Sequence, residues 1–351
     1  MAAKELNDMD VCEKIAFKPE TEKPFKARIV WFNAIGFLIL HLAALYGVFL
    51  GFTAITWKTF IWGFFVGYLS TESVTIGAHR MYTHKAFKAT FATRLVINFL
   101  FTLAGQNCMW VWVRDHRQHH RYSDTVADPH DASQGFFFSH IGWLMYKKHP
   151  EVLAKGKHID MSDIEKDEIV MFQKKYYKTL YVLISIALPT VIPYLCWGED
   201  LFNSFMWSYL ARTIVTLNGT WCVNSWAHLY GVKPYNTDIY PMESEFVAFI
   251  SSGEGWHNFH HTFPWDFRAA EFGKHYNFSA TVITQLAKWG FVYDLKEAKP
   301  EMIKSRILKN GDGTHPKHTQ LQKGAEWAPW GSKDAPTSEH ASSRRNIVSH
   351  G

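Results

Sequence analysis

The 351-residue sequence contains few cysteines and lacks several familiar metal signatures. Cys12, Cys108, Cys196 and Cys222 are scattered without C-x-x-C spacing, and three of them lie in apolar stretches, so we expect buried free thiols. The H-E-x-x-H pattern is also missing, which argues against a zinc protease. A net charge of only +5 does not indicate nucleic-acid binding; it suits an anionic membrane surface or an anionic substrate.

The chain also lacks a solenoid-type repeat and an apolar signal segment at its start. Aromatic residues, in contrast, are abundant at 16%, with 15 Trp and 27 Phe. Such residues are typical of membrane interfaces, where Trp and Tyr keep one end in water and the other in lipid. The mean hydropathy of the whole chain is nevertheless slightly negative, so a sizeable part of it must lie in water.

Four apolar runs are long enough to cross a hydrocarbon core of about 30 Å. They cover residues 30–52, 60–78, 177–197 and 201–222. Helices are expected for all four, because backbone polar groups in lipid must be hydrogen-bonded within the segment. Very short links join the first run to the second and the third to the fourth, which predicts two helical hairpins.

Basic residues are concentrated before the first run and after the second, while the links carry little beyond Lys58. This distribution places both termini and the middle region in the cytosol. Residues 95–113 form a further apolar segment. If this segment crossed the membrane, His79 and His84 would lie on one side and His116, His119 and His120 on the other. We therefore expect it to lie at the membrane interface or packed beneath the cytosolic part. We expect residues 1–28 to be a polar cytosolic segment and 301–351 a polar, disordered tail.

Histidines are clustered at the ends of the second and fourth runs and in the stretches between and after them. The clustered residues, with one asparagine, are His79, His84, His116, His119, His120, Asn224, His228, His257, His260 and His261. Spacings of three and four place group members on one helical face, whereas His79 and His84 share a face only if the helix ends between them.

Folding the hairpins together would gather these groups at one site on the cytosolic side of the membrane. The nine imidazoles are too many for one metal but fit two six-coordinate ions with a position open. Imidazole binds iron, copper, zinc and nickel, so spacing does not settle the metal. The predicted fold is therefore an all-α integral membrane protein, with four transmembrane helices in two hairpins and a helical cytosolic cap that holds a dinuclear metal site.

Around these residues the chain resembles the membrane fatty-acyl-CoA desaturase family of the stearoyl-CoA desaturase type. The matching strings are G-A-H-R, R-D-H-R-Q-H-H, A-D-P-H-D, G-F-F-F-S-H-I-G-W-L and H-N-F-H-H-T-F-P-W-D, and the likeness covers residues 31–299. The resemblance implies that the histidines bind two Fe2+ ions and that Asn224 reaches one of them through water. It also implies a desaturase domain over residues 29–300 in the endoplasmic-reticulum membrane.

The reaction implied by the resemblance uses a fatty-acyl-CoA, O2 and electrons from cytochrome b5 and its NADH-dependent reductase. No H-P-G-G haem motif occurs, so the electron donor is expected to be a separate protein. A hydroxylase is the nearest alternative, because similar iron chemistry can return oxygen to the substrate. A histidine-rich metal transporter or sensor is a more distant one.

The same resemblance names substrate contacts. It implies that Gln106, Trp112, Thr220 and Trp221 line the bend of an acyl tunnel, and that Asn33, Arg114, Asp115, Lys147 and Lys148 contact the CoA head group. Cationic side chains suit the phosphates of CoA. The alternatives are core packing for the two tryptophans and a solvated basic pair for the two lysines.

Two positions depart from the family pattern near the end of the tunnel. Gly67 stands where mammalian members have a bulky aromatic residue, and Glu72 stands where an apolar residue is usual. A carboxylate within a membrane is costly and often functional, although a structural partnership is the alternative. The string T-E-S-V-T-I-G-A-H-R is similar to the insect pheromone-making branch. Chain length and the position of the double bond, of the Δ9 or Δ11 type, therefore stay open.

Overall fold

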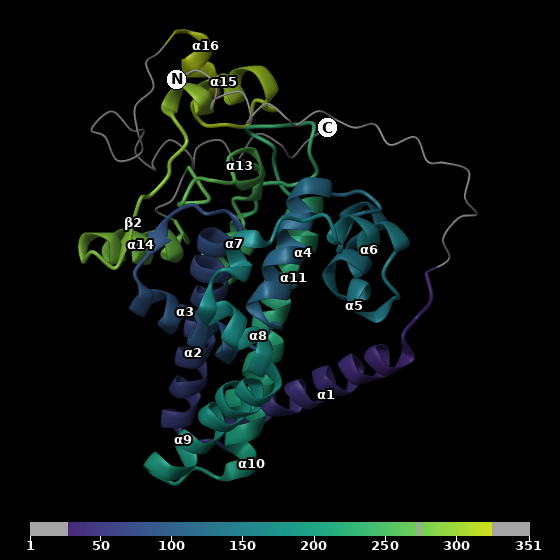
Figure 1. Ribbon diagram of the computed structural model, residues 1–351, viewed down its shortest axis with the longest axis vertical. Helices are drawn as coiled ribbons and strands as arrows, with labels where there is room; N and C mark the ends of the chain where they lie inside the picture. The colour runs from purple at the N-terminus through teal and green to yellow at the C-terminus, as the bar shows by residue number, and fades with distance from the viewer. Residues whose placement is uncertain (1–26, 272–274, 325–351) are drawn as a thin grey trace, which may run out of the picture.

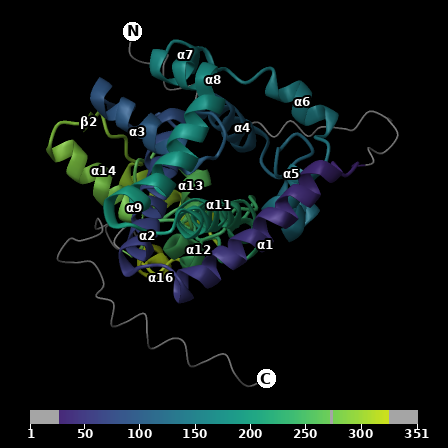
Figure 2. The same cartoon turned by 90° about the horizontal axis from the view of Figure 1, so that it is seen from below.

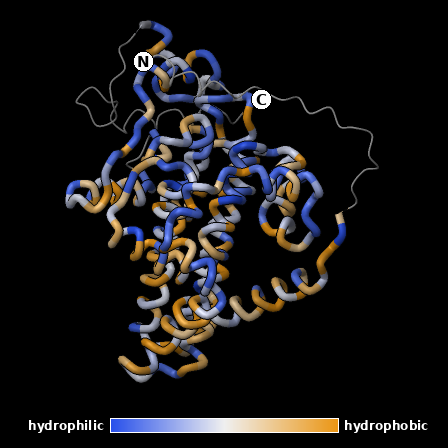
Figure 3. Tube along the Cα trace, in the orientation of Figure 1, coloured by the Kyte–Doolittle hydropathy of each residue, from blue (hydrophilic) through white to orange (hydrophobic). Residues whose placement is uncertain are grey.

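Four helical rods cover the four predicted apolar runs (Figure 1). The structure, a computed structural model, describes residues 27–271 and 275–324. The rods are α1 (Trp31–Thr53), α2 with the π-helix η2 (Trp57–Glu72 and Ser73–Thr83), α8 with η5 and α9 (Glu168–Leu180, Tyr181–Ala187 and Leu188–Trp197), and α10 with η6 and α11 (Leu201–Ser204, Phe205–Ala211 and Arg212–Leu229). Hydrophobic residues predominate in the lower part of the trace, where α1, α2, α9 and α10 lie (Figure 3).

Two of the rods, Trp31–Thr53 and Glu168–Trp197, are long and apolar enough to cross a membrane. A third candidate is the pair α3 (Phe91–Ala104) and α4 (Met109–Tyr122), which are bent by 85° at the break between them. The break follows from Gly105, whose φ of +73° ends α3 in a left-handed cap. Residues 95–113 therefore do not form one straight helix.

The two short links between rods are tied to each other by Glu199. Its carboxylate accepts hydrogen bonds from the backbone N–H and the hydroxyl of Thr56, at 2.9 and 2.8 Å, and from the hydroxyl of Thr59 at 2.5 Å. Thr56 caps the start of α2, so the same residue that begins one helix anchors the turn between α9 and α10. Both links consequently lie at the same end of the rods.

Arg212 holds the middle of the rods together. Its buried guanidinium donates to the carbonyl oxygens of Ser208, Leu103 and Ser185, at 3.2, 2.8 and 3.2 Å, and to the Ser70 hydroxyl at 3.3 Å. These four partners belong to η6, α3, η5 and α2. A buried cation is tolerated only when its donors are satisfied, so this arrangement fixes the positions of four elements at once.

Helix α1 crosses the bundle obliquely and packs closely on η6. The crossing is seen in the view from below, in which the axis of α11 points nearly at the viewer (Figure 2). The close approach depends on glycine. A Cβ atom on Gly47 would lie 2.3 Å from the carbonyl oxygen of Met206, and one on Gly51 would lie 2.5 Å from the Trp207 ring. Small residues of this kind let helix backbones approach within a membrane, where close packing stabilises helix association.

The remaining elements form a cap above the rods. They are β1 (Lys88–Ala89), η3 (Ala132–Gln134), η4 (Phe138–Gly142), α5 (Trp143–Met145), α6 (Pro150–Gly156), α7 (Ser162–Glu165), α12 (Glu245–Ile250), α13 (His257–Thr262), α14 (Phe278–Lys288), β2 (Val292–Tyr293), α15 (Pro300–Asn310) and α16 (His318–Gln322). β1 and β2 pair antiparallel, with Lys88 opposite Tyr293.

The expectation of disorder from residue 301 onward is wrong for residues 301–324. The described part of that range contains most of α15 and all of α16, because Ile303, Ile307 and Leu321 are buried in a small core against Phe259 and Phe263. Three apolar side chains in a polar segment are enough to dock it when a matching surface exists. The expectations for residues 1–26 and 325–351 lie outside the described residues.

The α1–η6 contact can be tested with a matched pair of glycines. Gly47→Val should lower the free energy of unfolding by about 1–3 kcal/mol, because the added carbons meet backbone atoms that cannot move aside. Gly36→Val, in the same helix, should have a much smaller effect, since nothing lies within 4 Å of its Cβ position. Thermal unfolding of the detergent-solubilised protein measures both. Equal midpoints for the two variants would contradict the close contact.

Candidate metal centre

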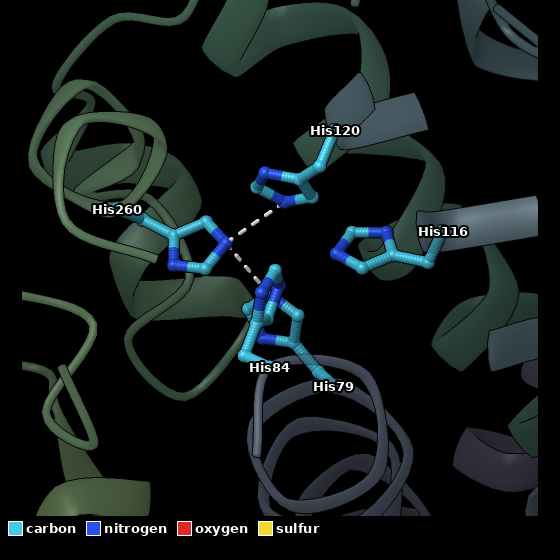
Figure 4. Close-up of side chains that lie close together, drawn as sticks. All are labelled: His79, His84, His116, His120 and His260. Atoms are coloured by element: carbon cyan, nitrogen blue, oxygen red, sulfur yellow. Dashed lines mark hydrogen bonds between the residues drawn. The ribbon is translucent and has the colours of Figure 1, made fainter. Parts of the chain in front are cut away.

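The clustered histidines come from four elements that meet beneath the cap. His79 and His84 lie at the end of η2, His116, His119 and His120 on α4, His228 at the end of α11, and His257, His260 and His261 on α13. Five of them, His79, His84, His116, His120 and His260, face one another in Figure 4. The structure thus brings together all nine clustered histidines that the sequence singled out.

The pair His79 and His84 share a face because of how η2 ends. The helix stops at Thr83, one residue before His84, as the five-residue spacing required. Its last turns are π-helical, and the His84 N–H donates to the His79 carbonyl oxygen at 3.2 Å across five residues. The two ring centroids consequently lie 4.9 Å apart.

The ring nitrogens divide into two groups, each with its atoms within 4.8 Å of one another. One contains His79, His84, His116, His120 and His260, and the other His119, His228, His257 and His261. Nε2 atoms approach one another at 2.9 Å between His79 and His260, and at 3.0 Å between His228 and His257. Two ligands at right angles on metal–nitrogen bonds of about 2.1 Å would lie about 3.0 Å apart. The spacing fits two metal ions, each surrounded by imidazoles.

Unpaired nitrogens support the same conclusion. The Nε2 atoms of His84 and His116 are buried and have no hydrogen-bond partner within the described ranges. Buried polar atoms are normally paired, so such atoms call for a ligand. Burial, and then the neighbouring histidines, hold the pKa well below its usual range for His84, His116, His120, His257, His260 and His261. These rings are therefore neutral, which is the form that binds metal.

Three carboxylates orient histidines from behind. Asp128 lies 2.8 Å from Nδ1 of His119, and Asp124 lies 3.0 Å from Nδ1 of His228. Burial alone would lower the pKa of His119, but Asp128 and nearby carboxylates raise it. A carboxylate on one ring nitrogen fixes the tautomer, so that the other nitrogen points its lone pair at the metal.

Glu254 is the third of these carboxylates and carries the most connections. It lies 2.9 Å from Nδ1 of His79, and it accepts hydrogen bonds from Nε and Nη2 of Arg80 at 3.1 and 2.9 Å. Burial would raise the pKa of Glu254, but Arg80 and His79 lower it to about 2. Arg80 in turn donates to the carbonyl oxygens of Phe267 and Arg268, which links η2 to the loop after α13.

These three carboxylates were missed by the reasoning from sequence. Asp128 stands in the string A-D-P-H-D, and Glu254 lies three residues before His257, so both signals were available. Nothing in the spacing alone assigns a given acid to a given histidine. Spacing likewise did not predict the position of His130. This residue lies 3.7 Å from Asp128 and forms a smaller cluster with Asp128 and His119.

A cavity of about 510 Å3 begins beside the histidines and continues between the rods. His79, His116 and His257 line it at one end, with Asn224 close by on α11, one helical turn before His228. Two of the predicted tunnel residues, Trp112 and Thr220, also line it, and Gln106 donates to the Thr220 hydroxyl at 2.8 Å. The lining is largely apolar, as an aliphatic ligand requires.

Two other predicted tunnel residues, Trp221 and Glu72, do not line this cavity. Trp221 packs against Phe37, with ring centroids 5.8 Å apart, and against His140 at 5.9 Å, so it belongs to the contact between α11, α1 and η4. Gly67 lines the cavity, whereas Glu72 is outside the set of lining residues. The buried Glu72 carboxylate accepts a hydrogen bond from Ser279 at 2.8 Å, which joins α2 to α14.

A second cavity, of about 620 Å3, lies on the other side of α4. Arg114, Asp115 and Lys148 line it, and Asp115 pairs with Arg114 at 2.5 Å and with Lys148 at 3.1 Å. Two further predicted contacts, Asn33 and Lys147, are not among its lining residues. The Asn33 amide donates to the Leu144 carbonyl at 2.8 Å, and the Lys147 N–H donates to the Arg28 carbonyl at 2.9 Å.

A sequence model of the fatty acid desaturase family matches residues 55–277. The chain belongs to the fatty acid desaturase family. Similar proteins include "Acyl-CoA Delta12-desaturase" of Acheta domesticus, 48% identical over 90% of this chain and 86% of the relative. "Acyl-CoA Delta-9 desaturase" of the same organism is 46% identical (91% and 87% covered), and "Stearoyl-CoA desaturase" of Homo sapiens is 44% identical (83% and 80% covered).

In this desaturase, the role of Glu254 can be tested through metal content. Glu254→Gln keeps the volume but removes the charge that orients His79, so metal affinity should fall about 10–100-fold. Elemental analysis of the purified protein, after titration with Fe2+, measures the loss. Glu271→Gln is the matched control, because that buried carboxylate bonds Tyr235 and His315 away from the nine histidines. Full metal retention in Glu254→Gln would contradict the orienting role.

Proposed function

We propose that this chain is an acyl-CoA desaturase that introduces a double bond into a fatty-acyl chain held beside two iron ions. The supporting observation is the position of the histidine groups at one end of a long apolar cavity, in a chain 44–48% identical to named acyl-CoA desaturases. The substrate carbons are unactivated methylenes, from which no protein side chain abstracts hydrogen, so a metal cofactor is required. The enzyme is an oxidoreductase of lipid metabolism.

The two metal sites would be formed by the five-histidine group and the four-histidine group. Asn224 would complete the smaller group through a water molecule, since it faces the same cavity as His257. Iron bound there would supply an O2-dependent oxidation that removes two hydrogens. The described residues do the rest: His rings hold the ions, Asp124, Asp128 and Glu254 hold the rings, and the apolar wall keeps water away.

Helix α4 would separate the two ends of the substrate. Trp112 and His116 line the cavity beside the metals, whereas Trp110 and Arg114 line the second cavity. Residues two apart on a helix point about 200° away from each other, so this single helix presents one face to each cavity. The acyl chain would occupy the first cavity and the CoA head group the second.

The second cavity is lined by three cations, Arg114, Lys148 and Lys157, and by three carboxylates, Asp115, Asp160 and Glu165. Arg114 and Lys148 are available to phosphates, and Asp115 holds both cations in place. The bonds of Asn33 and Lys147 tie the segment that bears Lys148 to the start of α1. Anchoring the head group at a fixed distance from the metals would select which methylene pair is oxidised.

The membrane arrangement is proposed on the same basis. Four spans in two hairpins would put the links joined by Glu199 on one side and the histidines on the other, with both termini cytosolic. We propose the endoplasmic reticulum as the membrane, and cytochrome b5 with its NADH-dependent reductase as the electron supply. The catalytic domain would run from residue 29 past residue 300, because α15 and α16 pack against α13.

Expression in desaturase-deficient yeast tests the proposal. We expect new monounsaturated lipids, and fragmentation mass spectrometry will locate the double bond, at Δ9, Δ11 or another position. Hydroxylated fatty acids with no alkene would overturn the desaturase assignment in favour of a membrane hydroxylase. Metal uptake without any lipid product would instead support a transporter.

His119→Ala should abolish desaturation while the protein still accumulates in the membrane. The variant removes one of the four imidazoles of its metal group, together with the contact between His119 and Asp128, so that group loses its geometry. Lipid analysis of yeast that expresses the variant measures the product. His158→Ala, at an exposed position, should remain active. Normal turnover by His119→Ala would rule out the ligand assignment.

Gly67→Tyr should shorten the preferred chain. A Cβ atom at Gly67 meets only Arg212 and Thr216, at 3.4 and 3.9 Å, so the backbone accepts a side chain and the ring must enter the cavity. The ratio of shorter to longer monounsaturated products in yeast lipids measures the change. Gly36→Tyr, on an open face of α1, should leave the ratio unchanged. An unaltered profile for Gly67→Tyr would refute an acyl chain that passes this residue.

A further inference from the structure

The acyl cavity follows the contact between two parallel rods. On α2 and η2 it is lined at Gly63, Gly67, Thr71, Thr75 and His79. On η6 and α11 the lining positions include Trp207, Ala211, Val215, Gly219 and Val223, at intervals of four residues, and the row one residue later, Arg212, Thr216, Thr220 and Asn224. Such intervals keep the lining on one face of each helix.

The length of this lined face shows how far the cavity extends. From His79 back to Gly63 it spans 16 residues. At 1.5 Å per residue the α-helical part alone, from Gly63 to Glu72, is about 14 Å long, and seven π-helical residues extend the lined face to His79. The cavity therefore continues one helical turn beyond Gly67, which the family resemblance placed near its end.

Trp207 lies at the far limit of the cavity. Its indole stacks on Phe60, with centroids 5.1 Å apart and planes 9° from parallel, and meets the edge of Phe64 at 5.7 Å. Its Nε1 donates to the Phe60 carbonyl oxygen at 3.2 Å. The only polar atom of the side chain is thus paired, and Trp207 presents an apolar surface to the cavity, which it lines together with Val48 and Phe52.

Two glycines hold this indole in place. A Cβ atom on Gly51 would lie 2.5 Å from the six-membered part of the ring, and one on Gly63 would lie 2.2 Å from Nε1. These positions belong to α1 and α2, so the ring fills a slot between two helices and is only 8% exposed. The ring is therefore confined by the backbones of both helices.

Gly67 offers no comparable barrier. It lies one helical turn nearer the metals than Gly63, has no side chain, and faces the aliphatic part of Arg212. One turn of helix corresponds to about 5–6 Å. Tetrahedral C–C bonds of about 1.5 Å advance an extended chain by roughly 1.25 Å per carbon, so this turn adds room for roughly four carbons.

We propose that Trp207 is the residue that ends the acyl cavity and thereby sets the longest fatty-acyl chain that the enzyme accepts. The proposal rests on the proposed function, since it assumes that the cavity holds the acyl chain. Because the paired indole offers only carbon to the ligand, the end of the chain that it meets is an unsubstituted methyl terminus.

The test uses three variants in membranes from desaturase-deficient yeast. Each membrane preparation is given a mixture of palmitoyl-, stearoyl-, eicosanoyl- and docosanoyl-CoA, which compete for the enzyme. Trp207→Leu opens the far end, and Trp207→Phe opens it in part while keeping the stack on Phe60. Trp62→Leu is the matched control, because Trp62 neighbours Gly63 but does not line the cavity, and instead bonds the Pro189 carbonyl of α9 at 3.0 Å. Monounsaturated products are measured for each chain length.

We expect Trp207→Leu to raise the ratio of eicosanoyl to palmitoyl product roughly tenfold, because the extra methylenes of the longer chain can then occupy the space that the indole filled. Trp207→Phe should give a smaller rise, and Trp62→Leu should match the wild type. An unchanged ratio in active Trp207→Leu would overturn the proposal. If that variant fails to accumulate in the membrane, an unchanged ratio in Trp207→Phe overturns it instead. Wild-type membranes that form no alkene would refute the desaturase function itself, which is a separate outcome.

Discussion

The structure depends on holding many neutral imidazoles close together away from water. Nine rings from η2, α4, α11 and α13 meet in two groups, and most of their pKa values are lowered by burial and by one another. Buried ring nitrogens packed this closely call for ligands. The carboxylates of Asp124, Asp128 and Glu254 orient three of the nine rings, and two metal ions would bind the nitrogens that face the centre.

The rods and the cap serve this centre in different ways. Arg212 and Glu199 fix the rods at two levels, so the ends that bear His79 and His228 arrive side by side. The cap supplies α13, and α15 and α16 cover that helix from above. Helix α4 lies between the two cavities, and its opposite faces separate an apolar compartment from a charged one. This separation supports the proposal that an acyl-CoA would be held at both ends, with its middle beside the histidines.

Much of this could be predicted from residue spacing. The apolar runs predicted helices where α1, α2, α9 and α11 lie, and the five-residue interval between His79 and His84 correctly required a helix end. Tertiary contacts could not be read in the same way. Trp221 matched a tunnel residue by family comparison but packs on Phe37 of α1, because the rotation of α11 turns it away from the cavity. The polar composition beyond residue 300 favoured disorder, yet three apolar side chains found a surface to bury against.

The sequence by itself determined the chemistry: the number and spacing of the histidines, the apolar runs and the family to which the chain belongs. These are local patterns, and periodicity alone assigns them to helical faces. Which acid orients which histidine, and how far the apolar cavity extends, depends on tertiary packing. Gly51, Gly63 and Trp207 are far apart in the chain and form one slot only after three helices pack together. Residue spacing along the chain does not predict steric contact between distant segments. The position of Trp207, and with it the proposed end of the cavity, depends on such a contact.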